Sequence, residues 1–184
     1  MRDDVNEDIG ELDLSGPQPV LRYVRTLAHS PERVWRALTE PAELEHWFPT
    51  TIEGERARGA PLTFAFRAVD IADMEGTMLA CDPPRLLEFS WGGDVLRFEI
   101  ERDGHGCRLF LSDTFSPVGK AARDGAGWHV CLERLIAAVD GHPVDADEDA
   151  DRWRQVHPGY VERFGPEALT LGPPEEWEAQ HGPA

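Results

Sequence analysis

Apolar and polar residues alternate along several short stretches of the chain, a pattern typical of half-buried β-strands. The first stretch is 20–27, VLRYVRTL. Six more follow, at 51–57, 61–68, 73–81, 85–92, 94–102 and 106–115. Dipeptides that favour tight hairpins, such as Gly92-Gly93 and Asp103-Gly104, separate some of them. We therefore expect seven strands, with the last six forming an antiparallel meander whose strand order follows the sequence.

Apolar residues recur at helical spacing between the first strand and the meander. Ser30 fits an N-cap, and Pro31 fits the first helical position after it. Thr39 and Pro41 repeat this combination a few residues later. The pattern predicts two short helices within 31–48.

A longer helical pattern covers residues 119–140, with one wide apolar side and Gly141 at the position of a C-cap. Such a helix is expected to lie across a sheet. Further along, aromatic residues between Trp153 and Phe164 predict a short helix docked on the body of the protein. Pro158 is expected to break that helix.

Length and composition favour one domain with appendages. The chain has 184 residues, 41% of them hydrophobic, which suits a single hydrophobic core. Both ends are rich in acidic residues. We predict a flexible acidic segment at 1–18, a folded domain at 19–141 and an acidic extension with a short docked helix at 142–184.

The strong negative charge narrows the class of partners. A formal net charge of −17 repels polyanions, so nucleic acid is not expected as a partner. Neither a signal-peptide pattern nor an apolar run long enough to span a bilayer is present, so we expect no membrane partner. The three cysteines lack C-x-x-C spacing, which argues against a zinc site and suits the reducing cytoplasm.

The order of the expected elements and several motifs resemble one known family. The motifs are SPERVWRALTEPAELEHWF at 30–48, LLEFSW at 86–91 and GWHVCLERL at 127–135. They are similar to START-like (SRPBCC) proteins related to the C-terminal domain of the activator of heat-shock protein 90 ATPase. The resemblance implies an α+β helix-grip fold, with a curved seven-stranded antiparallel sheet wrapped around a long C-terminal helix and two short helices after strand one.

The same resemblance implies a cavity between sheet and long helix that holds a hydrophobic or amphipathic small molecule. We therefore hypothesise a carrier or sensor of a small lipophilic molecule that uses no cofactor and no metal, and we leave a homodimer open as its assembly state. Phe110 is also expected to face inward, and the alternative for each apolar position is ordinary core packing. The expected ligand-binding residues are Trp47, Phe48, Phe64, Phe66, Met74, Met78, Phe89, Trp91, Phe98, Asp113, Trp128, His129 and Leu132.

Two polar residues are the most informative members of this set. Asp113 interrupts an apolar alternation in 106–115, and His129 follows Trp128 in the apolar part of the long helix. Pointing inward, they could orient a ligand's polar end or exchange a proton with it; capping or surface roles are the alternative. His129 and Cys131 lie about 200° apart on a helix, which argues against a shared metal.

Two other function classes stay open. One is a cyclase, dehydratase or hydrolase of the same fold, in which Asp113 and His129 perform acid–base chemistry. The sequence lacks a nucleophile elbow, a P-loop, a dinucleotide-binding motif and a zinc-protease motif, so it favours binding over catalysis. The other is a protein-interaction module, similar to a co-chaperone, that uses exposed surface and the acidic tail.

Overall fold

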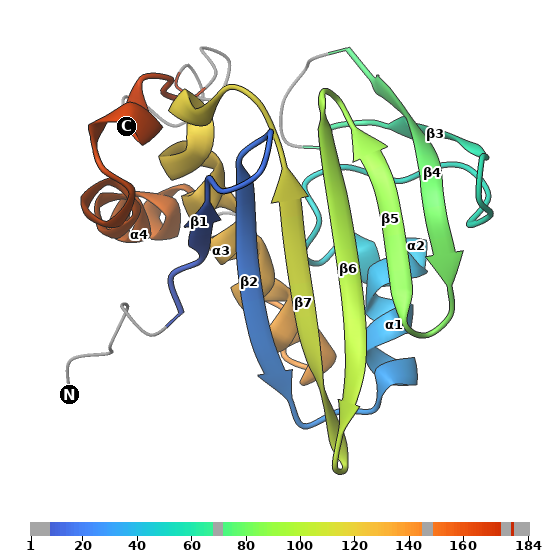
Figure 1. Cartoon of the computed structure of the whole chain (residues 1–184). Helices are drawn as coiled ribbons and strands as arrows, with labels where there is room; N and C mark the ends of the chain where they lie inside the picture. Colours follow the sequence, from blue (N-terminus) through green and yellow to red (C-terminus); the bar gives the residue numbers. More distant parts are fainter. Residues whose placement is uncertain (1–7, 68–71, 145–148, 174–177, 179–184) are drawn as a thin grey trace.

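A single antiparallel sheet, with helices on one of its faces, organises the protein (Figure 1). The computed structural model describes residues 8–67, 72–144, 149–173 and 178. In chain order the elements are β1 (Glu11–Asp13), β2 (Val20–Leu27), α1 (Pro31–Thr39), α2 (Pro41–Leu44), β3 (Pro61–Phe64), β4 (Met74–Asp82), β5 (Leu86–Trp91), β6 (Asp94–Asp103), β7 (Gly106–Thr114), η1 (Val118–Lys120), α3 (Ala121–Val139), α4 (Asp149–Phe164) and η3 (Pro166–Leu169). This is the α+β helix-grip architecture that the sequence predicted.

The seven strands are arranged in the order β1-β2-β7-β6-β5-β4-β3. From β3 to β7 each strand pairs with its neighbour in the sequence, which confirms the meander. The first long strand joins the other side of this meander, because β2 pairs with β7 along its whole length, from Val20 opposite Thr114 to Leu27 opposite Cys107. The long helix α3 then lies across the face of the sheet that also carries α1 and α2 (Figure 1).

The seventh strand is not the one that the sequence predicted. Residues 51–57 form no strand: the one isolated bridge within them joins Glu53 to Thr63, and a second joins the preceding Thr50 to Phe66. Gly54 has a φ of +124°, which takes the chain out of the extended conformation. The seventh strand is instead β1, which lies inside the segment expected to be flexible and pairs with β2. That expectation was wrong for the described residues 8–13, since Ile9 is only 7% exposed.

The helix boundaries follow their sequence signals closely. Ser30 caps α1 as predicted, because its Oγ accepts a hydrogen bond from the Arg33 backbone N–H at 3.2 Å. At α2 the cap position belongs to Glu40, while the Thr39 hydroxyl donates to the Trp35 carbonyl. Gly141 follows α3 with a φ of +83°, which confirms its predicted role at the C-terminus of the helix.

Helix α4 continues through Pro158 without a break, so the expected interruption was wrong. Proline removes one helical hydrogen bond, but this helix buries Trp153, Val156 and Tyr160 against the body of the protein. Tertiary packing on α3 therefore outweighs the local cost. Among the described residues, no helix is both long and apolar enough to cross a bilayer.

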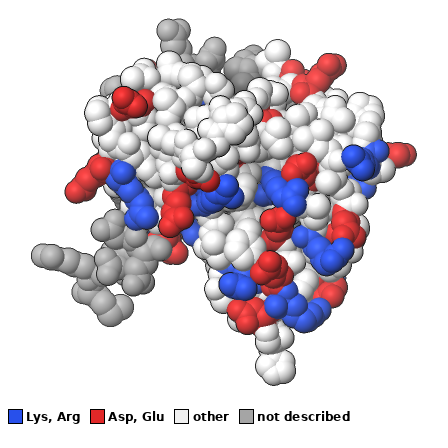
Figure 2. All heavy atoms as spheres, viewed as in Figure 1, with Lys and Arg blue, Asp and Glu red and all other residues white. Residues whose placement is uncertain are grey.

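The outer face of the sheet is a solvated surface of paired charges, which Figure 2 shows as rows of blue and red over the strands. Arg97 forms ion pairs with Glu88 and Glu99 there. Phe110 also lies on this face, with the Arg108 guanidinium 5.5 Å from its ring centroid. Its predicted inward orientation was wrong, because the alternation along β7 turns the odd-numbered residues inward.

Candidate functional site

Aromatic rings fill much of the interior between the sheet and α3. Phe89 stacks against Phe64 and Phe98, with centroid distances of 5.7 and 6.2 Å. Trp47 meets Phe98 edge-on at 5.9 Å. These four side chains are at most 1% exposed. Met78 and Leu132 are buried to the same extent in the same hydrophobic core. This central part of the expected ligand site is a close-packed core.

The other expected aromatic residues gather where β5 ends. Trp128 of α3 lies 5.5 Å from Trp91 and 5.9 Å from Phe48, measured between ring centroids. Phe66 lies 6.2 Å from Trp91, and Met74 lies beside Gly92 of the adjoining turn. We call these five residues the aromatic end of the interior. Three of them, Phe66, Met74 and Trp91, are only partly buried, so the aromatic end reaches the surface.

Asp113 lies beside the aromatic end and is 1% exposed. It sits near the end of β7, opposite Leu21 on one side and Leu96 on the other. The indole N–H of Trp128 donates to Asp113 Oδ2 at 2.9 Å. Asp113 therefore faces inward, which is one of the two orientations that the sequence left open.

Two buried polar atoms at this place have no hydrogen-bond partner among the described residues. They are Asp113 Oδ1 and the indole nitrogen Nε1 of Trp91. Both side chains contact Trp128, one through its hydrogen bond and the other through its ring. Buried polar groups are nearly always paired, and an unpaired one costs about 1–3 kcal/mol.

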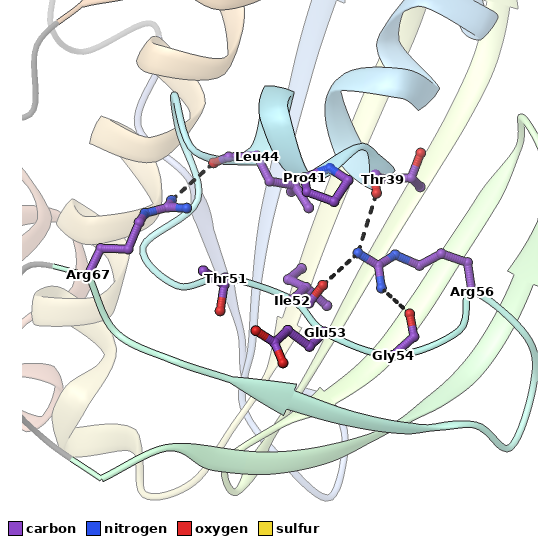
Figure 3. A pocket seen from close by; sticks show the side chains of 9 residues that line it. All are labelled: Thr39, Pro41, Leu44, Thr51, Ile52, Glu53, Gly54, Arg56 and Arg67. Carbon is purple, nitrogen blue, oxygen red and sulfur yellow. Dashed lines mark hydrogen bonds between the residues drawn. The ribbon is translucent and has the colours of Figure 1, made fainter.

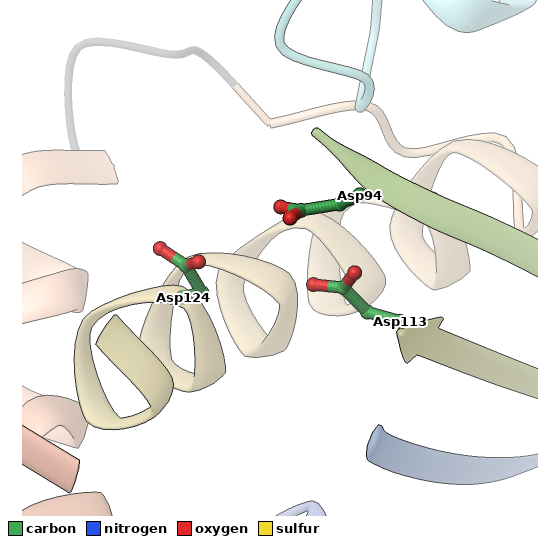
Figure 4. Close-up of side chains that lie close together, drawn as sticks. All are labelled: Asp94, Asp113 and Asp124. Carbon is green, nitrogen blue, oxygen red and sulfur yellow. The ribbon is translucent and has the colours of Figure 1, made fainter. Parts of the chain in front are cut away.

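Two further carboxylates surround Asp113 (Figure 4). Asp94 begins β6 and Asp124 lies in the first turn of α3, and each offers an oxygen within 4.8 Å of the others. Lys120 donates to both oxygens of Asp94, at 2.6 and 2.7 Å, and lies 3.6 Å from Asp124. Burial, and secondarily the negative charge of Asp94, raise the pKa of Asp113 to about 7.

Basic side chains next to Asp94, Asp113 and Asp124 offset the negative charge of this carboxylate cluster. Carboxylate oxygens of this kind are the ligands that Mg²⁺ and Ca²⁺ prefer. Here the ammonium of Lys120 already lies between Asp94 and Asp124, and Arg123 contacts Asp124 at 2.6 Å. Asp113, with its raised pKa, can carry a proton near neutral pH. The cluster can therefore present a hydrogen-bond donor or an acceptor at Asp113.

His129 is buried as well, but it faces a different part of the molecule. Its Nδ1 lies 3.1 Å from the Tyr160 hydroxyl, and its Nε2 lies 3.2 Å from Glu133 Oε1. Burial alone raises the pKa of Glu133, but hydrogen bonds from Arg152 and His129 outweigh it and lower that pKa to about 2. The structure therefore joins His129 to α4 and does not bring it together with Asp113. No Asp113–His129 acid–base pair is formed.

Two open cavities lie outside the sheet–α3 interior. The first has a volume of about 600 Å³ and is lined by residues of α1, α2, the loop 51–56 and Arg67. The second, of about 440 Å³, lies over α3 and α4, and charged residues such as Glu133 and Arg134 line it. The charged side chains of the second cavity form ion pairs, whereas Arg56 and Arg67 of the first are bound by backbone carbonyls.

Several residues around Asp113 and in the larger cavity were not identified from the sequence. Asp94, Lys120 and Asp124 surround Asp113, and Arg56 and Arg67 line the larger cavity. One usable signal was the spacing of Lys120, Asp124 and Trp128, which puts the three on one side of a helix. Asp94 and the two arginines carry no comparable pattern, because tertiary contacts alone place them.

Comparison with known proteins gives one family and many structures of the same fold. The family described as activator of Hsp90 ATPase homolog 1-like protein matches residues 28–140, more than half of the chain. A search of the curated proteins finds no match.

Among solved structures, the conserved protein of unknown function EF2215 from Enterococcus faecalis has a TM-score of 0.69 at 22% identity, covering 88% of this chain and 92% of its own. CalU16 from Micromonospora echinospora has a TM-score of 0.66 at 20% identity, covering 85% and 99%. The protein encoded by gene BPP1335 from Bordetella parapertussis has a TM-score of 0.62 at 26% identity, covering 85% and 91%. The fold is thus shared, and the match over residues 28–140 shows that the chain belongs to the activator of Hsp90 ATPase homolog 1-like family.

Proposed function

We propose that the chain binds a small amphipathic molecule at the aromatic end, with the apolar body of the ligand between the rings and its polar end at Asp113 and Trp91. The observation that carries this proposal is the pair of unpartnered buried atoms, Asp113 Oδ1 and Trp91 Nε1, whose side chains share Trp128 as a neighbour. Members of this family generally bind hydrophobic ligands, which supports the same class of function.

The chemistry of the two atoms indicates the polar group of the ligand. Trp91 Nε1 can only donate a hydrogen bond, whereas Asp113 Oδ1 accepts when ionised and can donate when protonated. A hydroxyl group can satisfy both, because it donates and accepts at once. Pairing two buried groups recovers about 1–3 kcal/mol each, which is enough to select a hydroxylated ligand over an apolar one.

The remaining expected residues fall into two roles. Phe66, Met74 and Trp91 form the partly exposed rim, where side chains can move to admit a ligand. The packed core beneath holds the rings of Phe48 and Trp128 in place. That core comprises Trp47, Phe64, Met78, Phe89, Phe98 and Leu132. We assign His129 to the attachment of α4 and not to the ligand.

A matched pair of probes tests the proposal. We expect 2-naphthol to bind at least about 10-fold more tightly than 2-methylnaphthalene, because a difference of 1.4 kcal/mol is tenfold in affinity. Isothermal titration calorimetry gives the two dissociation constants, and thermal-shift screening of flavonoids, sterols, polyketides and fatty acids extends the series.

Variants locate the site. Trp91→Phe keeps a ring but removes the unpartnered N–H, and Asp113→Leu removes both carboxylate oxygens, so each should abolish the preference for 2-naphthol. Trp35→Phe makes the same type of change on α1 and should leave binding unaltered, since Trp35 is not part of the aromatic end. Equal affinity for the two probes, or a preference that survives in both site variants, contradicts the proposal.

A further inference from the structure

The larger cavity has apolar walls with a cationic group at each side (Figure 3). Pro41, Leu44 and Ile52 supply the apolar lining, and Arg56 and Arg67 reach in from opposite sides. Its volume of about 600 Å³ lies within the range of small-molecule sites. The ends of α1 and α2 and the loop 51–56 form its wall, and it shares no lining residue with the aromatic end.

Both arginines are held by neutral backbone oxygens. Arg56 donates from Nη1 to the Gly54 carbonyl at 2.9 Å, and from Nη2 to the carbonyls of Thr39 and Ile52 at 3.3 and 3.0 Å. Arg67 donates from Nη2 to the carbonyls of Leu44 and Phe48. These contacts fix the positions of the guanidinium groups without neutralising them.

Donors remain on both groups. A guanidinium has five N–H bonds. Within the described part of the chain, Nε and one hydrogen of Nη1 are uncommitted on Arg56, and Nε and Nη1 are uncommitted on Arg67. No carboxylate of the described residues forms an ion pair with either side chain, although Glu45 is near enough to Arg67 to influence it.

The electrostatic balance of the cavity is opposite to that of the whole chain. Glu53 is the acidic residue in its lining, so two arginines leave a formal charge of +1 in a chain of net charge −17. Burial lowers the pKa of Arg56 and of Arg67, as expected for cations that lose water without gaining an anion. An anion held there would supply the missing partner and could accept two parallel hydrogen bonds from a guanidinium.

We propose that this cavity is a second binding site, which takes a small molecule carrying one anionic group, carboxylate or phosphate, on a short apolar body. The anionic group pairs with Arg56, the apolar body lies on Pro41, Leu44 and Ile52, and Arg67 adds positive charge from the opposite side of the cavity. Glu53 opposes binding by its charge and so limits the affinity.

Three probes of equal chain length test this proposal by calorimetry on the full chain at low ionic strength: octanoate, octyl phosphate and octan-1-ol. We expect at least one of the two anions to bind 10-fold or more tightly than the alcohol, and its affinity to fall as sodium chloride is added. The ratio between octanoate and octyl phosphate then identifies the anionic group that the site prefers. Alcohol binding as tight as that of both anions overturns the proposal.

Substitutions in the cavity should change the affinity for the anion in both directions. Arg56→Gln should weaken binding of the preferred anion 10-fold or more, while Arg58→Gln, on an exposed arginine of the same loop, should leave it unchanged. Glu53→Gln should tighten binding about 1.5- to 5-fold, because it removes a like charge near the anion. The tighter binding of Glu53→Gln still tests the proposal if Arg56→Gln weakens binding only by loosening the loop that Arg56 holds. No gain in Glu53→Gln together with no loss in Arg56→Gln overturns the proposal.

The two proposed sites can be tested separately, because each has its own variant and its own probe. Trp91→Phe should leave the affinity for the preferred anion unaltered, and Arg56→Gln should leave the preference for 2-naphthol over 2-methylnaphthalene intact. Loss of anion binding in Trp91→Phe would place the anion at the aromatic end and overturn the second site.

Discussion

Replacing Asp113 by asparagine should change how the stability of the protein depends on pH. Asn has nearly the same shape, and its carbonyl oxygen can still accept the hydrogen bond from Trp128, but it does not titrate. Any difference in pH dependence between the two proteins therefore comes mainly from the proton on Asp113.

The structure sets the sign and size of this difference. The pKa of Asp113 rises from 3.8 to about 7 on folding, chiefly through burial. The unfolded chain therefore loses this proton first, and stability that is fully present below pH 3.8 is lost as the pH rises through 7. The total loss is about 4 kcal/mol, at 1.36 kcal/mol for each pH unit between the two values. About 2 kcal/mol of this loss of stability falls between pH 5.5 and pH 8. This range lies above the pI of about 4.7, so the protein carries a net negative charge throughout it.

Urea unfolding at several pH values between 5.5 and 8 measures this difference without adding salt. The free energy of unfolding of the wild type, relative to Asp113→Asn, should fall by about 2 kcal/mol across the range. Asp13→Asn is the matched control: hydrogen bonds from Ser15 and Arg22 lower the pKa of Asp13 to about 2, so it stays ionised throughout and its difference stays constant. A constant difference for Asp113→Asn as well would show that folding does not raise the pKa of Asp113.

Urea unfolding also tests the docking of α4, a buried hydrogen bond and a helix cap. Gly125→Ala should destabilise the protein by about 1–3 kcal/mol, because the added Cβ would lie 2.6 Å from the Tyr160 ring. Gly127→Ala on the same helix meets open space and should stabilise the protein by up to about 1 kcal/mol. Equal effects of the two substitutions would contradict the docking of α4. Tyr160→Phe should cost about 1–2 kcal/mol, since the hydroxyl accepts from the Gly10 N–H at 3.1 Å, and an unchanged midpoint would argue against this buried contact. Ser30→Ala should cost about 1 kcal/mol through loss of the N-cap, and a neutral result would show that the cap contributes little.

Local patterns in the sequence were sufficient for most of the fold. Alternation identified β2 and the meander, because one face of each strand is buried and the other is solvated. Ser30, Pro31 and Gly141 act through contacts with residues three to five positions away, so they could be interpreted without knowledge of the fold. The sequence left the orientation of Asp113 open, and the structure shows that the alternation along β7 turns it inward.

The errors at β1 and Pro158 have a different cause, which is that distant contacts override local preference, whereas the error at Phe110 came from assigning the wrong face to the alternation of β7. Strand β1 has only three residues and forms because β2 offers it an edge, while Pro158 is tolerated because α4 is docked. The partners of Asp113 could not be predicted either. Lys120 reaches Asp94 across 26 positions of sequence. Arg56 similarly reaches Thr39 from 17 positions away.

Binding at the aromatic end requires that its two unpartnered atoms receive the polar group of the ligand. The most direct test is a titration with 2-naphthol followed through the indole N–H signals of the six tryptophans in ¹⁵N-correlated NMR spectra, with Trp91→Phe identifying the signal of Trp91. We expect the signals of Trp91 and Trp128 to shift together and saturate, while that of Trp35 stays in place. Saturable binding that leaves the Trp91 signal unmoved would contradict it.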